Sequence, residues 1–115
     1  MSRESYVFNK VNIDGIIRGV AEVYDVKPEQ IKGRGRTGIV AEARQVAMCL
    51  TWKALGGIDG CQSETGRLFD REHGTVQHAL RAVRDKLDYH RPTQIRWREL
   101  RHLAVPEEHD HDYMI

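Results

Sequence analysis

The sequence predicts an all-α fold, and three observations support that prediction. Apolar residues recur at steps of three and four in several segments, which is the spacing of a helix that buries one face. No segment alternates between apolar and polar residues in the way that a half-buried strand does. The chain has 115 residues with 40% hydrophobic content, which suits one domain with a small core. We therefore expect roughly five or six helices in that domain.

The amino-terminal part contains two predicted helices. The first covers residues 12–25, where Asn12 or Asp14 is suited to cap the amino end. The second is a short helix over residues 28–31, because Pro28 favours a first helical turn and a glycine soon follows.

A basic loop rich in glycine, residues 32–38, comes next and carries Arg34 and Arg36. Its glycines allow the backbone to approach a ligand closely. A long helix is then predicted over residues 39–55, because an apolar stripe runs along it and two glycines follow its last turn. The stripe consists of Val40, Ala43, Val46, Ala47, Leu50 and Ala54.

The carboxyl-terminal half contains the best-patterned helix, predicted over residues 71–89 with Asp70 as its amino-terminal cap. A short helix over residues 60–69 precedes it. Pro92 is expected to break the chain before a further helix over residues 93–104. The buried face of the long helix is predicted to hold Val76, Ala79, Leu80, Val83 and Leu87.

A short helix, a tight connection and a longer helix are the arrangement of a helix-turn-helix, in which the first residues of the second helix meet base edges in the major groove. Here those residues are Arg71, Glu72, His73, Gly74 and Thr75. Arginine can contact phosphate or guanine, glutamate can accept from cytosine, and histidine and threonine can bond to bases or phosphates. The same pattern is also that of any ordinary surface helix, so the pattern alone leaves both interpretations open.

Two stretches of the sequence are more specific. Residues 40–50 read VAEARQVAMCL and residues 69–79 read FDREHGTVQHA. Together with VAEVY at residues 20–24 and with Arg36, they resemble the C-terminal DNA-binding domain of the bacterial replication initiator DnaA. The resemblance covers residues 12–89. It implies an all-helical domain of the Trp-repressor-like fold that binds double-stranded DNA in replication or transcription regulation.

The resemblance also implies roles for individual residues. It assigns the major groove to the group from Arg71 to Thr75, and the minor groove to Arg36, a side chain that suits that narrow, negative groove. Arg44 and Gln45 are implied to fix the register of the protein on the DNA backbone. Further candidates for DNA contact, mainly with phosphates, are Arg34, Lys53, His78, Arg81 and Arg84.

Five positions depart from the usual residues of that family. Glu72 stands where Asp is usual and Gly74 where Thr is usual, which removes the contact of a threonine methyl group with thymine. Glu42 and Ala43 replace a pair that is frequently basic and then proline, and Trp52 replaces a frequent lysine. These departures predict an altered preference among DNA sequences.

Charge is distributed unevenly along the chain. The 18 Lys and Arg residues nearly balance the 17 Asp and Glu residues, but residues 106–115 hold four acids and no Lys or Arg. The basic excess therefore lies in residues 1–105, which suggests a basic face on the folded body and an acidic tail. One hypothesis is that the acids mimic phosphate and compete for the basic face, which would be self-inhibition.

Several activities are excluded by missing signals. The chain has no G-x-x-x-x-G-K-[ST] loop and is too short for an ATPase domain, so no nucleotide cofactor is expected. His73 and His78 are five positions apart and fall on different faces of a helix, while Cys49 and Cys61 lack ligand spacing, so no metal is expected. No nucleophile–base pair or carboxylate pair stands out, and we expect no enzyme.

We expect four segments: an N-terminal extension (1–11), the DNA-binding domain (12–91), an extra helix (92–104) and a flexible acidic tail (105–115). The sequence shows neither a secretory signal nor an apolar run that could span a bilayer, so a cytoplasmic protein without membrane contact is expected. The alternative is a protein-interaction module that keeps the fold but has lost sequence-specific DNA binding. In that case residues 93–104 would contact a protein partner or a second copy.

Overall fold

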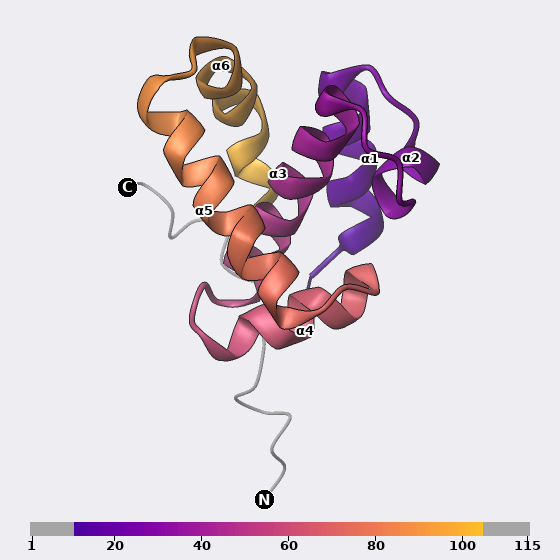
Figure 1. Cartoon of the computed structure of the whole chain (residues 1–115), viewed down its shortest axis with the longest axis vertical. Coiled ribbons are helices and arrows are strands. Elements are labelled where there is room, and N and C mark those ends of the chain that lie inside the picture. Colours follow the sequence, from indigo (N-terminus) through magenta and orange to yellow (C-terminus); the bar gives the residue numbers. More distant parts are fainter. Residues whose placement is uncertain (1–10, 105–115) are drawn as a thin grey trace, which may run out of the picture.

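The structure is a computed structural model that describes residues 11–104, and a long central helix organises it (Figure 1). This helix, α3, packs against α1, α2, α4, α5 and η2, and one of its side chains, Glu42, also contacts α6. Six α-helices and no strand occur within the described range, which confirms the all-α prediction. The elements in chain order are α1 (Ile13–Tyr24), α2 (Pro28–Lys32), α3 (Gly38–Leu55), α4 (Gly60–Phe69), α5 (His73–Tyr89), α6 (Arg91–Leu100) and a 3-10 helix, η2 (Arg101–Ala104).

Burial on α3 extends well beyond the predicted stripe. The stripe residues are buried, but so are three polar side chains, Glu42, Arg44 and Thr51. The cause is that α1, α2, α4, α5 and η2 surround the helix, so it has little solvent-facing surface left. On α5 the predicted face is confirmed, with Val76 and Val83 fully buried and Leu87 half-buried at its end.

Two helices end at an aspartate in the left-handed conformation, Asp25 after α1 and Asp70 after α4, with φ of 57° and 55°. The prediction that Asp70 caps the start of the next helix is therefore wrong. Asp70 instead closes α4, a place that aspartate fills because its short polar side chain tolerates left-handed φ. At the other end of α1, the prediction of Asn12 as a cap is confirmed, since Asn12 Oδ1 accepts from Gly15 N at 2.9 Å.

The carboxyl-terminal helix also differs from its prediction. Pro92 does not break the chain ahead of a helix but lies in the first turn of α6, where its missing N–H needs no partner. α6 packs on α1 and α5, and it buries Thr93 and Leu100. Thr93 and Leu100 thus anchor the 93–104 segment on the protein, while Ile95, Arg98 and Arg101 stay exposed. In the described part of the chain, no helix has the length and apolarity needed to cross a membrane.

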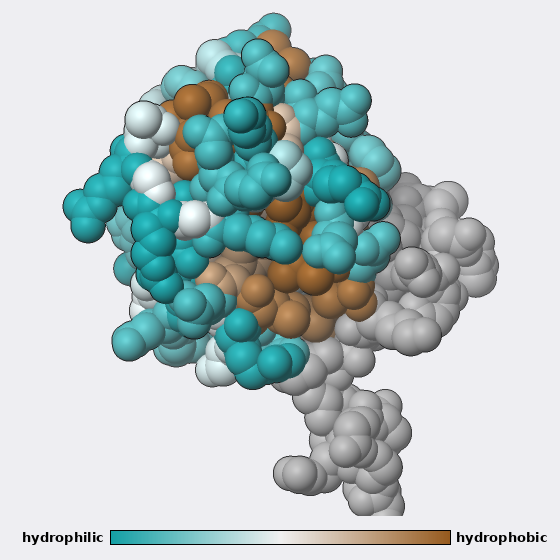
Figure 2. Space-filling model, turned by 90° about the vertical axis from the view of Figure 1, so that its right-hand side faces the viewer, coloured by the Kyte–Doolittle hydropathy of each residue, from teal (hydrophilic) through white to brown (hydrophobic). Residues whose placement is uncertain are grey.

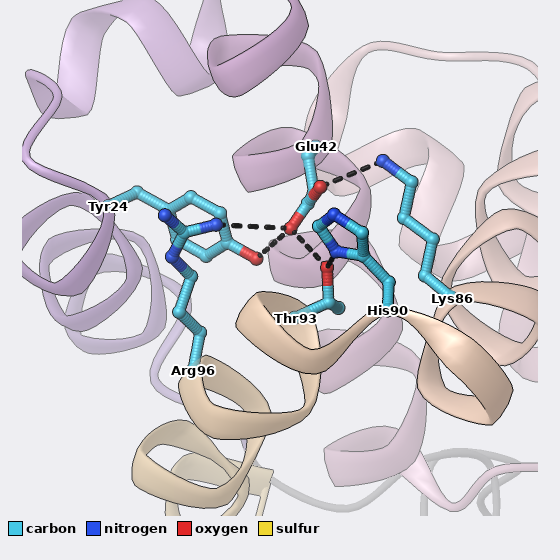
Figure 3. Close-up of polar contacts among 6 residues, drawn as sticks. All are labelled: Tyr24, Glu42, Lys86, His90, Thr93 and Arg96. Carbon is cyan, nitrogen blue, oxygen red and sulfur yellow. Dashed lines mark hydrogen bonds and ion pairs between the residues drawn. The ribbon is translucent and has the colours of Figure 1, made fainter.

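A buried carboxylate joins four helices (Figure 3). Glu42 on α3, only 5% exposed, accepts from Tyr24 Oη on α1 at 2.7 Å and from Thr93 Oγ1 on α6 at 2.8 Å. Lys86 Nζ on α5 lies 2.8 Å away, and Arg96 Nη1 lies 3.7 Å away. Because the groups facing position 42 are cations and hydroxyl donors, an acid fits there, whereas a basic residue would repel Lys86 and Arg96.

The surroundings of Glu42 also determine its protonation. Burial by itself raises the pKa of the carboxyl, but hydrogen bonds from Lys86, Tyr24 and Thr93 outweigh that effect and hold the pKa below its usual value. A carboxyl with a depressed folded-state pKa stabilises the fold above its unfolded pKa, and this stabilisation is lost as the pH falls through the folded value.

We predict that Glu42→Gln lowers the free energy of unfolding by roughly 1–3 kcal/mol near neutral pH, because it leaves the half-buried Lys86 and Arg96 without a charged partner. Urea unfolding measures this. The difference between wild type and variant should shrink as the pH falls below about 4.3, the usual pKa of glutamate. The control is Glu22→Gln, which changes an exposed carboxyl on α1. Equal losses for the two variants would contradict the role of Glu42.

Candidate nucleic-acid interface

A tight turn joins α4 to α5 and fixes the angle between them. The N–H of Arg71 donates to Gly66 O at 2.7 Å and that of Asp70 donates to Arg67 O at 3.2 Å, the paired bonds of a Schellman ending. Gly66 is buried, and a Cβ atom there would lie 2.5 Å from the carbonyl oxygen of Arg71. The close approach of these two backbone segments therefore requires glycine at position 66.

The first turn of α5 is open to solvent. The helix begins at His73 rather than at the predicted Arg71, because Arg71 takes part in the ending of α4 and Glu72 is extended with φ −83° and ψ 160°. Glu72, His73, Gly74 and Thr75 are all exposed, while Val76 directly after them is fully buried and anchors the helix on the core. Four of the five predicted base-reading residues thus lie on an accessible helix start.

The basic loop lies against the α4–α5 turn. The Arg71 guanidinium donates to the carbonyl oxygen of Gly33, and also to Phe69 O at 2.7 Å. From the loop, Arg34 Nη2 donates to the backbone oxygen and the carboxylate of Asp70, both at 3.2 Å. Segments nearly 40 positions apart in the sequence are therefore in direct contact. The loop that carries the exposed Arg36 adjoins the turn that leads into α5.

Arg44 occupies a different place from the one predicted for a residue that contacts the DNA backbone. It is 9% exposed, and its guanidinium donates to three carbonyl oxygens of the α2–α3 region: Gln30 O at 2.7 Å, Ile31 O at 2.8 Å and Gly35 O at 3.0 Å. Its donors are thus directed into the protein. We reassign Arg44 to holding the basic loop in shape, and Arg71, half-buried on Gly33 and Phe69, to joining the loop to the turn.

Positive charge is concentrated around this contact. Burial lowers the pKa of Arg44, and the neighbouring charges of Arg71 and Arg34 lower it further. Burial and Arg34 likewise lower the pKa of Arg71, while Asp70 opposes the shift. One charge shifts the pKa of another group appreciably only when the two are close. The shared lowering of these pKa values therefore indicates that the guanidinium groups of Arg34, Arg44 and Arg71 form one cluster. Such a cluster, beside an exposed helix start, suits a polyanionic ligand.

The remaining candidates fall into two places. His78 is exposed on α5 and Gln45 is half-buried on α3. Lys53 lies near the carboxyl end of α3, where it lines a cavity with Arg81 and Arg84 rather than joining the basic loop. The side of the molecule on which α1 and α2 lie has a largely hydrophilic surface, with apolar side chains visible at its upper left and, over a larger area, in its lower part (Figure 2).

Sequence reasoning missed two contacts at positions where the chain departs from the family pattern. The carboxylate of Glu42 serves the buried network described above. The indole N–H of Trp52 donates to Ile58 O at 2.9 Å and so holds the α3–α4 connection. The sequence did contain a signal for these contacts, namely the departures from the family pattern. An unusual residue at a helix position indicates that partners elsewhere in the chain match it, as Lys86 and Arg96 match Glu42.

Comparison with protein families adds an independent finding. Residues 13–83 match the family model described as the bacterial dnaA protein helix-turn-helix. This range includes α1 to α4 and most of α5, so both the basic loop and the α4–α5 turn lie inside it.

Individual relatives of this chain come from the same family as the matching family model. The chain is 39% identical over 74 residues to chromosomal replication initiator protein DnaA 1 of Chlamydia muridarum, 36% over 78 residues to the DnaA of Deinococcus radiodurans, and 37% over 79 residues to DnaA 2 of Chlamydia trachomatis. These matches cover 64%, 68% and 69% of this chain. They cover only 16%, 16% and 17% of the relatives, so the chain corresponds to a small part of their length.

The turn geometry yields a prediction that contrasts two glycines. Gly66→Ala should lower the free energy of unfolding by roughly 1–3 kcal/mol, because the added methyl group meets backbone that cannot move freely. Gly74→Ala should leave stability equal or raise it by up to about 1 kcal/mol, since nothing lies within 4 Å of an added Cβ and alanine favours helix. Thermal unfolding compares the two. Equal effects of the two substitutions would contradict this turn.

Proposed function

Because this chain belongs to the bacterial DnaA helix-turn-helix family, we propose that it binds double-stranded DNA without catalysis, with α5 in the major groove and Arg36 in the minor groove. A helix fits the major groove, where base edges present distinct donors and acceptors. The base-reading group is then Glu72, His73, Gly74 and Thr75. A regulatory role in replication or transcription, in the bacterial cytoplasm, is part of the proposal.

One observation carries the proposal: the basic loop contacts the turn that begins α5, through Arg71 with Gly33 and Arg34 with Asp70. Two DNA-reading parts must approach one duplex from one side, and a fixed contact between them supplies this arrangement before the ligand arrives. Preorganisation of this kind reduces the ordering that binding would otherwise require. The exposed arginines of the loop add phosphate attraction, which steers association and makes affinity depend on salt.

The exposed start of α5 supports base reading in a second way. No side chain among the described residues caps α5 at Glu72, and Thr75 N and Val76 N are the first amides to reach a helical acceptor, Glu72 O. The amides of His73 and Gly74 thus point out of the helix start, where a phosphate oxygen is a suitable acceptor. Phosphate contacts here would fix the depth of α5 in the groove.

We predict that affinity for random duplex DNA falls steeply with salt, and that Arg36→Ala reduces the slope of log K against log salt by about 1. The loss should be greatest where A·T pairs flank the site, because their minor groove is narrow. Fluorescence anisotropy measures both effects. The control is Arg91→Ala, which removes an exposed arginine from α6. If neither wild type nor variant binds at low salt, the chain is instead an interaction module that has kept only the fold.

Selection of bound duplexes from a random pool would first identify the preferred sequence. We then predict that His73→Ala loses roughly 1–3 kcal/mol of discrimination between that sequence and a mismatched one, while affinity for unrelated DNA changes little. His78→Ala serves as the comparison, because it changes a histidine one and a half turns further along α5. A uniform loss of affinity on all sequences would place His73 on phosphate rather than on a base.

The substitution Gly74→Thr tests the same surface by adding a contact with DNA instead of removing one. Since an added side chain at position 74 meets open space, the fold should accept threonine. The methyl group offers an apolar contact to a thymine, so preference should move toward sequences with an added thymine in the site. A repeated selection with the variant would show the change. An unchanged preference would mean that position 74 does not face base edges.

A further inference from the structure

A groove with tryptophan walls lies away from the basic loop, where α5, α6, η2 and the carboxyl end of α3 meet. It consists of two adjoining cavities of about 580 Å³ and 820 Å³. Both are lined by Trp52, Leu87 and Trp97, which are half-buried. We call this the tryptophan groove. Since the chain has two tryptophans, both of its indole rings belong to the groove.

The rim of the groove is strongly basic. Five cations contribute to its lining: Lys53, Arg81, Arg84, Arg98 and Arg101. All five are exposed, and no described carboxylate pairs with any of them. Asp59 is the one acid among the described lining residues. A groove lined by indole rings, with exposed cations on its rim, fits a peptide that combines acids with apolar side chains.

Such a peptide follows directly in this chain. Residues 105–115, which lie outside the described part, continue from Ala104, and Ala104 itself lines the larger cavity. This segment carries four acids, Glu107, Glu108, Asp110 and Asp112, and then the apolar residues Tyr113, Met114 and Ile115. Eleven residues reach about 35 Å when extended, and they start from a residue that already lines the groove.

We propose that the segment 106–115 docks in the tryptophan groove of its own chain. Its carboxylates would meet the rim cations, and its apolar residues would cover the indole rings. The sequence-based hypothesis of self-inhibition placed the acids on the basic face in general, whereas the cavities and unpaired cations point to this groove. Because Lys53, Arg81 and Arg84 are also candidates for phosphate contact, the docked segment would compete with DNA for them.

The test uses the full chain without DNA, so it is independent of the proposed function. The tail variant removes the four negative charges of the segment by the substitutions Glu107→Gln, Glu108→Gln, Asp110→Asn and Asp112→Asn. Tryptophan emission should shift to longer wavelength, and quenching by acrylamide should increase, because the rings become accessible to water. High salt should produce the same change in wild type, since it screens exposed ion pairs. Circular dichroism checks that the helices persist.

A groove variant, Arg98→Ala with Arg101→Ala, should reproduce the loss of protection, whereas Arg91→Ala, on α6 but not in the groove lining, should not. Identical emission and quenching in wild type, tail variant and groove variant would overturn the proposal. So would protection that appears only at high protein concentration, because the occupant would then be the tail of a second copy.

Discussion

Two arginine side chains hold the backbone carbonyl groups of the basic loop and of the helix ends beside it. Arg44 donates to three such carbonyls between residues 30 and 35, and Arg71 donates to Gly33 and Phe69. Hydrogen bonds from a charged donor are stronger than neutral ones, and a buried guanidinium leaves its acceptors few alternative partners. The loop therefore has a defined shape and a defined place beside the start of α5.

This arrangement divides the arginines into two sets with different tasks. The inner arginines, Arg44 and Arg71, hold the backbone, while Arg34 and Arg36 stay exposed on the same short loop. Burial is the main cause of the lowered pKa values of Arg44 and Arg71, and the nearby charge of Arg34 lowers both further. A polyanion bound at this surface would offset the repulsion among these neighbouring guanidinium groups, which favours the complex.

Much of the fold could be predicted from helical periodicity, since the buried face of α5 and the limits of α3 and α4 follow from local pattern. The ends were less predictable: Asp70 suits both the start of one helix and the close of another, and only the Gly66–Arg71 contact decides between them. The candidate site followed from the resemblance, but the inward direction of Arg44 and Arg71 did not. Their acceptors are backbone atoms distant in sequence, which no residue pattern identifies. The role of Glu42 could not be predicted for the same reason, since its partners come from three other helices.

The most direct test of the account is to map backbone amide chemical shifts by NMR while a duplex is titrated into the protein at low salt. We predict two sets of perturbed amides that respond together at one concentration of DNA: residues 34–37 in the basic loop and residues 72–75 at the start of α5. Perturbations confined to one of these segments, or centred on α6 and η2, would contradict it.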